Sequence, residues 1–171
     1  MISDGMQERL NKQLNAELYS AYLYLSMSAY FESLDMRGFA NWMHVQAKEE
    51  LTHAVKFFDF INSRNGRVIL QAVDAPPTSW DSAQEVFEEV CGHEQKVTGL
   101  INALVSGSLQ ESDHATNSFL QWFVTEQVEE EASANAVLQS LRLVGKDGSG
   151  LLMLDRELAQ RVFIPPAGAP A

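Results

Sequence analysis

The chain has 171 residues, 46% of them hydrophobic and 20% charged, which is the composition of one globular domain with a substantial core rather than of a disordered or fibrous chain. The net charge of −11 argues against binding to nucleic acid, whose phosphates attract lysine and arginine, and it favours cationic ligands. The single cysteine, Cys91, cannot form an internal disulfide, and no segment reads as a signal peptide or a membrane span. We therefore expect a cytoplasmic protein.

Four long segments place apolar residues at alternating intervals of three and four. The first covers about residues 3–34, the second begins near Asp35, its predicted N-cap, and the third and fourth begin near Asp81 and Ser112. Sustained alternation of this kind is typical of helices that pack nearly parallel or antiparallel to one another. The pattern predicts a four-helix bundle.

The connections predict the topology of this bundle. Short links at residues 34–36 and 107–111 make each consecutive pair of helices an antiparallel hairpin. Between the pairs lies a linker, residues 64–79, with a β-like start at residues 68–70. An extended linker of about 15 residues reaches about 50 Å, whereas a helix of about 26 residues is about 39 Å long. The linker can therefore cross the length of the bundle.

The C-terminal part follows a glycine-rich break at residues 145–148. A short amphipathic helix is expected over about residues 150–163, and the proline-rich residues 164–171 are expected to form a flexible tail. The predicted fold is thus all-α. It is a single domain over residues 1–171, with a four-helix bundle over about residues 1–145, one long crossover and a short fifth helix.

Each of the four predicted helices also carries polar residues on its core-facing seam, at positions where the 3-4 spacing requires apolar ones. They are Glu17 in the first segment, Glu50 and His53 in the second, Glu94 in the third, and Gln127 and Glu130 in the fourth. Glu50 and His53 lie one helical turn apart, so both can bind one divalent cation at roughly 2.0–2.2 Å. Taken alone, a Glu-x-x-His pattern more often marks a solvated face.

Four carboxylates in one core favour metal binding over a solvated face. Each would cost several kcal/mol if it were buried without a partner, and the seams supply no lysine or arginine. Two divalent ions would neutralise the four charges, so the sequence predicts a dinuclear metal site. Oxygen ligands with a single histidine suit iron or manganese better than structural zinc.

On these residues the chain resembles the bacterial non-haem ferritins over essentially its whole length. That family combines a Glu from each of two helices with Glu-x-x-His units and one long crossover. The residues that match its ferroxidase pattern are Glu17, Glu50, His53, Glu94 and Gln127. The resemblance implies that Glu17 and His53 hold one iron, that Glu50 bridges, and that Glu94 and Glu130 hold the other, with Gln127 close by.

Further roles are implied by the same resemblance. Tyr24 matches a tyrosine beside the iron pair that can supply an extra electron, and Trp122 matches a nearby tryptophan, although by spacing alone both would be ordinary core aromatics. A third iron position next to the pair is implied for Glu49, Glu126, Glu129 and Glu130. An acidic run such as residues 129–131 is otherwise usually a solvated face.

Two departures from related families are informative. The fourth segment carries Gln127 and Glu130 where permanent di-iron enzymes and haem-carrying bacterioferritins present a second Glu-x-x-His, and this weaker half suits iron that is oxidised and then leaves. Leu51 stands where bacterioferritins place their haem-binding methionine, so no haem is expected.

The iron entry route also departs from animal ferritins. Asn117 and Leu120 replace the two acids that line the three-fold channel of animal ferritins, and Asp113 or His114 could serve instead.

The sequence as a whole indicates an iron-storage ferritin. The resemblance implies a hollow homo-oligomeric shell of 24 chains that oxidises Fe(II) with O₂ or peroxide and stores ferric mineral. Two alternatives stay open. A ferritin-like oxidase or peroxidase would retain its iron, although the missing second Glu-x-x-His and the absence of a Cys-x-x-Cys module speak against it. A bundle that binds no metal would leave the four seam carboxylates unexplained.

Overall fold

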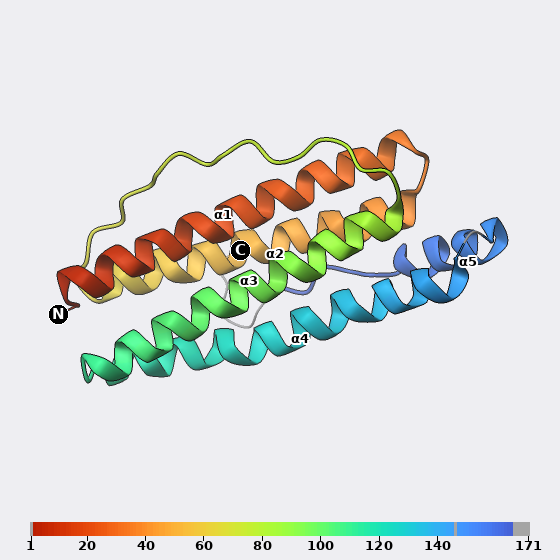
Figure 1. Ribbon diagram of the computed structural model, residues 1–171. Helices are drawn as coiled ribbons and strands as arrows, with labels where there is room; N and C mark the ends of the chain where they lie inside the picture. The colour runs from red at the N-terminus through yellow and green to blue at the C-terminus, as the bar shows by residue number, and fades with distance from the viewer. Residues whose placement is uncertain (1, 146, 166–171) are drawn as a thin grey trace.

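The computed structural model describes residues 2–145 and 147–165, which form five α-helices. These are α1 (Asp4–Ser33), α2 (Arg37–Ser63), α3 (Ala83–Gln110), α4 (His114–Val144) and α5 (Gly148–Leu158). The first four lie side by side as a bundle, and α5 stands at one end (Figure 1). The predicted all-α bundle with a fifth helix is confirmed.

The long crossover runs the length of the bundle along α1, as Figure 1 shows. It brings α3 back to the end where α2 starts, so α2 and α3 run parallel while each hairpin is antiparallel. The crossover is anchored to α1 by its backbone: Asn11 accepts from the Ile69 amide at 2.7 Å and donates to the Arg67 carbonyl at 3.0 Å. The β-like start expected at residues 68–70 forms no strand, because its backbone is paired with a helix side chain rather than with another strand.

Three of the four bundle helices begin with a local side-chain cap. Ser3, Ser82 and Asp113 each accept a hydrogen bond from the backbone N–H three residues later, which satisfies one of the free amides of the first turn. The fourth helix therefore begins after Asp113, and Ser112 lies in the turn with a positive φ of 54°.

Helix α2 is capped from a distance. The prediction that Asp35 caps it is wrong, because Asp35 lies in the preceding turn with φ 56° and Met36 provides no side-chain cap. Instead, Asp155 Oδ1 of α5 accepts from the Gly38 and Phe39 amides at 2.8 and 3.0 Å. Residue 38 must be glycine for this approach, since a Cβ there would lie 1.6 Å from the Asp155 carbonyl oxygen.

The fifth helix lies earlier than predicted. Asp147 accepts from the amides of Ser149 and Gly150 at 3.1 Å, so the helix starts at residue 148 and ends at residue 158 instead of covering about 150–163. Leu154 and Leu158 are buried against the bundle. Of the tail expected at residues 164–171, residues 164–165 are not helical and the remainder lies outside the described residues.

The core has two apolar clusters with a polar layer between them. One is built around Phe39 and Phe87 near α5, and the other around Phe57 and Phe123 towards the opposite end. On each of the four long helices, the change from one cluster to the other falls at the polar seam positions. Among the described residues, no helix has the combination of length and apolarity needed to cross a membrane.

Candidate metal centre

The polar layer at mid-bundle contains the six polar seam residues, and all of them are between 1% and 6% exposed. They are Glu17, Glu50, His53, Glu94, Gln127 and Glu130. Helices α1 to α4 each contribute at least one of them. Because each helix places its polar residue between two apolar turns that must be buried, the carboxylates are carried into the core with their helices.

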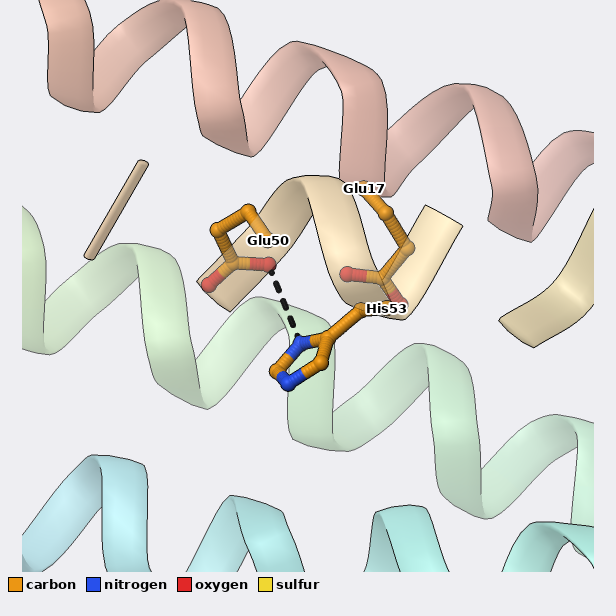
Figure 2. Close-up of side chains that lie close together, drawn as sticks. All are labelled: Glu17, Glu50 and His53. Carbon is orange, nitrogen blue, oxygen red and sulfur yellow. Dashed lines mark ion pairs between the residues drawn. The ribbon is translucent and has the colours of Figure 1, made fainter. Parts of the chain in front are cut away.

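A first group is formed by Glu17 of α1 with Glu50 and His53 of α2. One ligand atom from each lies within 4.8 Å of the others, and the three side chains converge as shown in Figure 2. His53 Nδ1 is 3.4 Å from Glu50 Oε2. Glu17 Oε1 accepts from Gln13 Nε2 at 2.8 Å, but Glu17 Oε2 is buried without a hydrogen-bond partner. A buried acceptor of this kind is suited to a cation.

A second group shares His53 with Glu126 and Glu130 of α4. His53 Nε2 lies 3.8 Å from Glu126 Oε1, so the two ring nitrogens face carboxylates of different helices. Glu130 Oε2 accepts from Gln46 Nε2 at 2.6 Å, while Gln46 Oε1 is buried and unpaired. Sequence reasoning did not single out Gln46, although its polar side chain at a seam position of α2 was the signal.

Glu94 of α3 is held by two neutral donors. Tyr24 donates from Oη to Glu94 Oε1, and Gln127 donates from Nε2 to Glu94 Oε2 at 3.2 Å. Gln127 is therefore connected to the other polar residues of the layer by its hydrogen bond to Glu94. The two aromatic residues both contact this layer: Tyr24 contacts Glu94, and the Trp122 ring packs edge-on against His53 with 5.3 Å between centroids.

The residues implied in a third metal position are placed unequally. Glu126 and Glu130 lie together with His53. Glu49 is engaged by Arg161, whose Nη2 is 2.5 Å from Glu49 Oε2. Glu129 is exposed and belongs to neither group of potential ligands in the described part of the chain.

The residues considered for iron entry are also placed by the structure. Asp113 caps α4 and pairs with Arg64 at 3.1 Å. His114 and Asn117 lie in the first turn of α4, and Leu120 is fully buried. Asp113 is therefore engaged within its own chain.

Burial dominates the electrostatics of the centre. Desolvation, followed by the charge of Glu50, raises the pKa of Glu17 to about 8, and desolvation likewise raises the pKa of Glu50, Glu94 and Glu130. For His53, burial opposes the charged form, but hydrogen bonds to Glu126 and Glu50 outweigh it and raise its pKa well above 6.5. A cation that displaced these protons would stabilise every carboxylate at once.

The set of donors fits a hard, redox-active cation. Carboxylate oxygens with one imidazole suit iron or manganese, and the half of the site on α4 has no histidine of its own. The two groups share His53, so they are adjacent, and either could hold a metal ion.

Comparison with known proteins identifies the family of this chain. The ferritin family, described as a ferritin-like domain, matches residues 7–144. Bacterial non-heme ferritin from Bacteroides fragilis strain 638R is 44% identical over 94% of this chain and 100% of that protein, and the Escherichia coli O6:H1 protein of the same name is 38% identical over 93% and 96%. An open-pore ferritin from the hyperthermophilic archaeon Archaeoglobus fulgidus is 56% identical with a TM-score of 0.94, covering 95% of this chain and 100% of that one. A closed form of that ferritin, engineered by site-directed mutagenesis, has 56% identity, a TM-score of 0.95 and coverage of 96% and 100%. The chain therefore belongs to the ferritin family.

Proposed function

We propose that this protein stores iron, and that it oxidises Fe(II) at the mid-bundle centre before depositing Fe(III) as an oxy-hydroxide mineral inside a hollow shell of 24 chains. One observation carries the proposal. Glu17, Glu50, Glu94 and Glu130 are buried in one layer, and no lysine or arginine of the described residues pairs with them. Such a core is stable in its charged form only with cations bound.

The ligands divide between two iron positions. Glu17 and His53 hold the first iron, Glu50 bridges, and Glu94 and Glu130 hold the second, with Gln127 beside it. In support, the ligand atoms of the first position already lie within 4.8 Å of one another. The carboxylates of the second position accept hydrogen bonds from the neutral donors Tyr24, Gln127 and Gln46. A cation could displace these donors because it attracts the carboxylates more strongly.

The chemistry follows from the donors. Each Fe(II) gives up one electron, and two electrons with two protons reduce O₂ to H₂O₂; peroxide can be the oxidant in the same way. Carboxylate oxygens favour the harder Fe(III), which promotes the oxidation. The raised carboxyl pKa values mean that the site releases protons when it binds iron, so protons are available beside the oxidant. Four electrons and four protons reduce O₂ to two H₂O, so Tyr24 can supply one electron beside three from Fe(II), with its phenol proton passing to Glu94.

A third iron position adjoins the pair, with Glu126, Glu129 and Glu49 as its own ligands and Glu130 shared. The contact of Glu126 with His53 supports its place beside the pair. The Glu126→Ala and Glu129→Ala double variant should keep the first fast oxidation of two Fe(II) per chain, alter the amount of O₂ consumed per iron and slow later turnover. Loss of the first phase would assign these residues to the catalytic pair, and unchanged behaviour at every iron load would make them a solvated face.

Assembly into a shell is supported by apolar side chains outside the bundle core. Ile69 and Leu70 of the crossover are 50% and 63% exposed, and Leu152 and Met153 of α5 are 53% and 72% exposed. Closed symmetric oligomers commonly bury such residues.

The proposal is tested by stopped-flow oxidation at two Fe(II) per chain. His53→Ala should abolish the fast phase, because it removes the ligand shared by both groups, and Glu50→Ala should do the same. His44→Ala is the matched control, since His44 is an exposed histidine of the same helix and should leave the rate unchanged. A wild-type rate in His53→Ala would contradict the assignment, as would purified wild-type protein that takes up no iron.

A further inference from the structure

The chain that follows α5 returns along α2 toward mid-bundle (Figure 1). We call residues 159–165 the C-terminal strap. It is tied to α2 by Asn41, whose Nδ2 donates to the carbonyl oxygens of Leu158 at 3.3 Å and Arg161 at 2.9 Å. The strap therefore has a defined position on α2, and its single basic side chain among the described residues is Arg161.

Arg161 is fixed by three contacts on α2. Its guanidinium lies over the Trp42 ring, 4.4 Å from the centroid, and Nη1 donates to the Trp42 carbonyl at 3.3 Å. Nη2 donates to Glu49 Oε2 at 2.5 Å. The two paired side chains are only 21% and 23% exposed, so the pair is largely shielded from water. Stacking and charge-assisted hydrogen bonds together orient the planar guanidinium.

Glu49 borders the metal centre. It precedes Glu50 in α2, and its charge interacts with both His53 and Glu126 as well as with Arg161. Burial raises the pKa of Glu49, and the positive charge of Arg161 opposes that rise. Glu49 thus neighbours a proposed iron ligand in the sequence of α2 and is paired with a protein cation.

We propose that Arg161 is the resident cation of the third iron position, here called the outer position, and that a metal ion can recruit Glu49 there only by displacing the guanidinium. The inference rests on the proposed function and adds to it a residue that sets the affinity of the outer position. Arg161 bonds to Trp42 and Glu49 and to none of the inner group of Glu17, Glu50 and His53, so the affinity of that group should depend much less on the strap. Iron therefore fills the inner position first and meets competition only at the outer one.

The competition has a definite sign and a modest size. A guanidinium and a metal ion cannot both hold the same carboxylate oxygen, so removal of the guanidinium strengthens metal binding at the outer position. Ion pairs outside the deep interior correspond to about a five-fold change in a binding constant. Lysine at position 161 would keep the charge but lose the fork and most of the stacking, so it should compete less than arginine and more than a neutral residue.

The test is a calorimetric titration of the metal-free protein with Zn²⁺, which binds without redox chemistry. Arg161→Gln should tighten the weaker sites about five-fold and leave the tightest site unchanged, with Arg161→Lys between it and wild type. Arg156→Gln is the matched control, because it removes an exposed arginine of α5 that forms no ion pair with Glu49 in the described structure. In a Glu49→Gln background, Arg161→Gln should have no further effect.

The outcomes separate the inference from the function on which it rests. If Arg161→Gln leaves all Zn²⁺ sites unchanged, or weakens them at an unaltered melting temperature, Arg161 is not a competitor and the inference is wrong. Fast oxidation of two Fe(II) per chain would in that case leave the proposed function intact. Absence of any tight Zn²⁺ site from wild-type protein would overturn both. Equal tightening by Arg156→Gln would show only a change in overall charge, which also refutes a specific role for Arg161.

Discussion

Replacing Glu17 with glutamine should stabilise the metal-free protein at neutral pH. Glu17 is 1% exposed and its Oε2 has no hydrogen-bond partner. Burial and the nearby charge of Glu50 raise its pKa from 4.5 to about 8. Glutamine has nearly the same shape, and its amide oxygen can still accept the hydrogen bond from Gln13. The substitution therefore removes an ionisable group without opening a cavity.

The magnitude follows from proton linkage. A carboxyl whose pKa is higher in the folded state contributes stability below its unfolded pKa, and this contribution is lost as pH rises toward the folded value. For Glu17 the window runs from pH 4.5 to about 8. Between pH 4.5 and 7 the release of one proton can lower the free energy of unfolding by at most about 3 kcal/mol. Because Glu17 shares its environment with Glu50, we expect Glu17→Gln to gain about 1–3 kcal/mol at pH 7 and almost nothing at pH 4.5.

The assay is calorimetric or denaturant unfolding of chelator-treated protein at several pH values across this window. Glu32→Gln, an exposed glutamate of the same helix, is the control for loss of a surface charge. Zn²⁺ should reverse the order, since it stabilises wild-type protein more than the variant that lacks a ligand. Destabilisation by Glu17→Gln at pH 7, or a pH dependence identical to that of wild type, would refute the reasoning.

Three further predictions concern other parts of the molecule. Asp155→Ala removes the side chain that accepts from the Gly38 and Phe39 amides, and it should lower the free energy of unfolding by about 1 kcal/mol. Asp155→Asn should lose less, because its amide oxygen can still accept. Equal melting temperatures for wild type and both variants would argue against the long-range cap. Tyr24→Phe should keep the first oxidation of two Fe(II) but raise the yield of H₂O₂, measured by a peroxidase-coupled assay, because it removes the extra electron donor beside Glu94. Light scattering at neutral pH should give the mass of a large closed oligomer, and a mass of one or two chains would refute the shell.

The sequence by itself was sufficient to predict the helical bundle and the burial of the polar residues at its middle. Helix type follows from the local 3-4 spacing of apolar residues, and hairpin pairing follows from connections too short for any other arrangement. The same spacing placed Glu17, Glu94 and Glu130 at seam positions, and all three are buried. Burial of a residue on an amphipathic helix depends on its angular position, which can be read from one segment alone.

Only the tertiary structure decided which side chains from different helices meet. Asp155 caps a helix that begins more than a hundred residues earlier, whereas Asp35, next to that helix in the sequence, lies in a turn. Helical periodicity gave no indication that Arg161 would hold Glu49, or that His53 would face Glu126. Periodicity specifies the face of a helix, whereas such pairs depend on the axial register of neighbouring helices and on where α5 docks. These are set by packing of the whole core, which no single segment encodes.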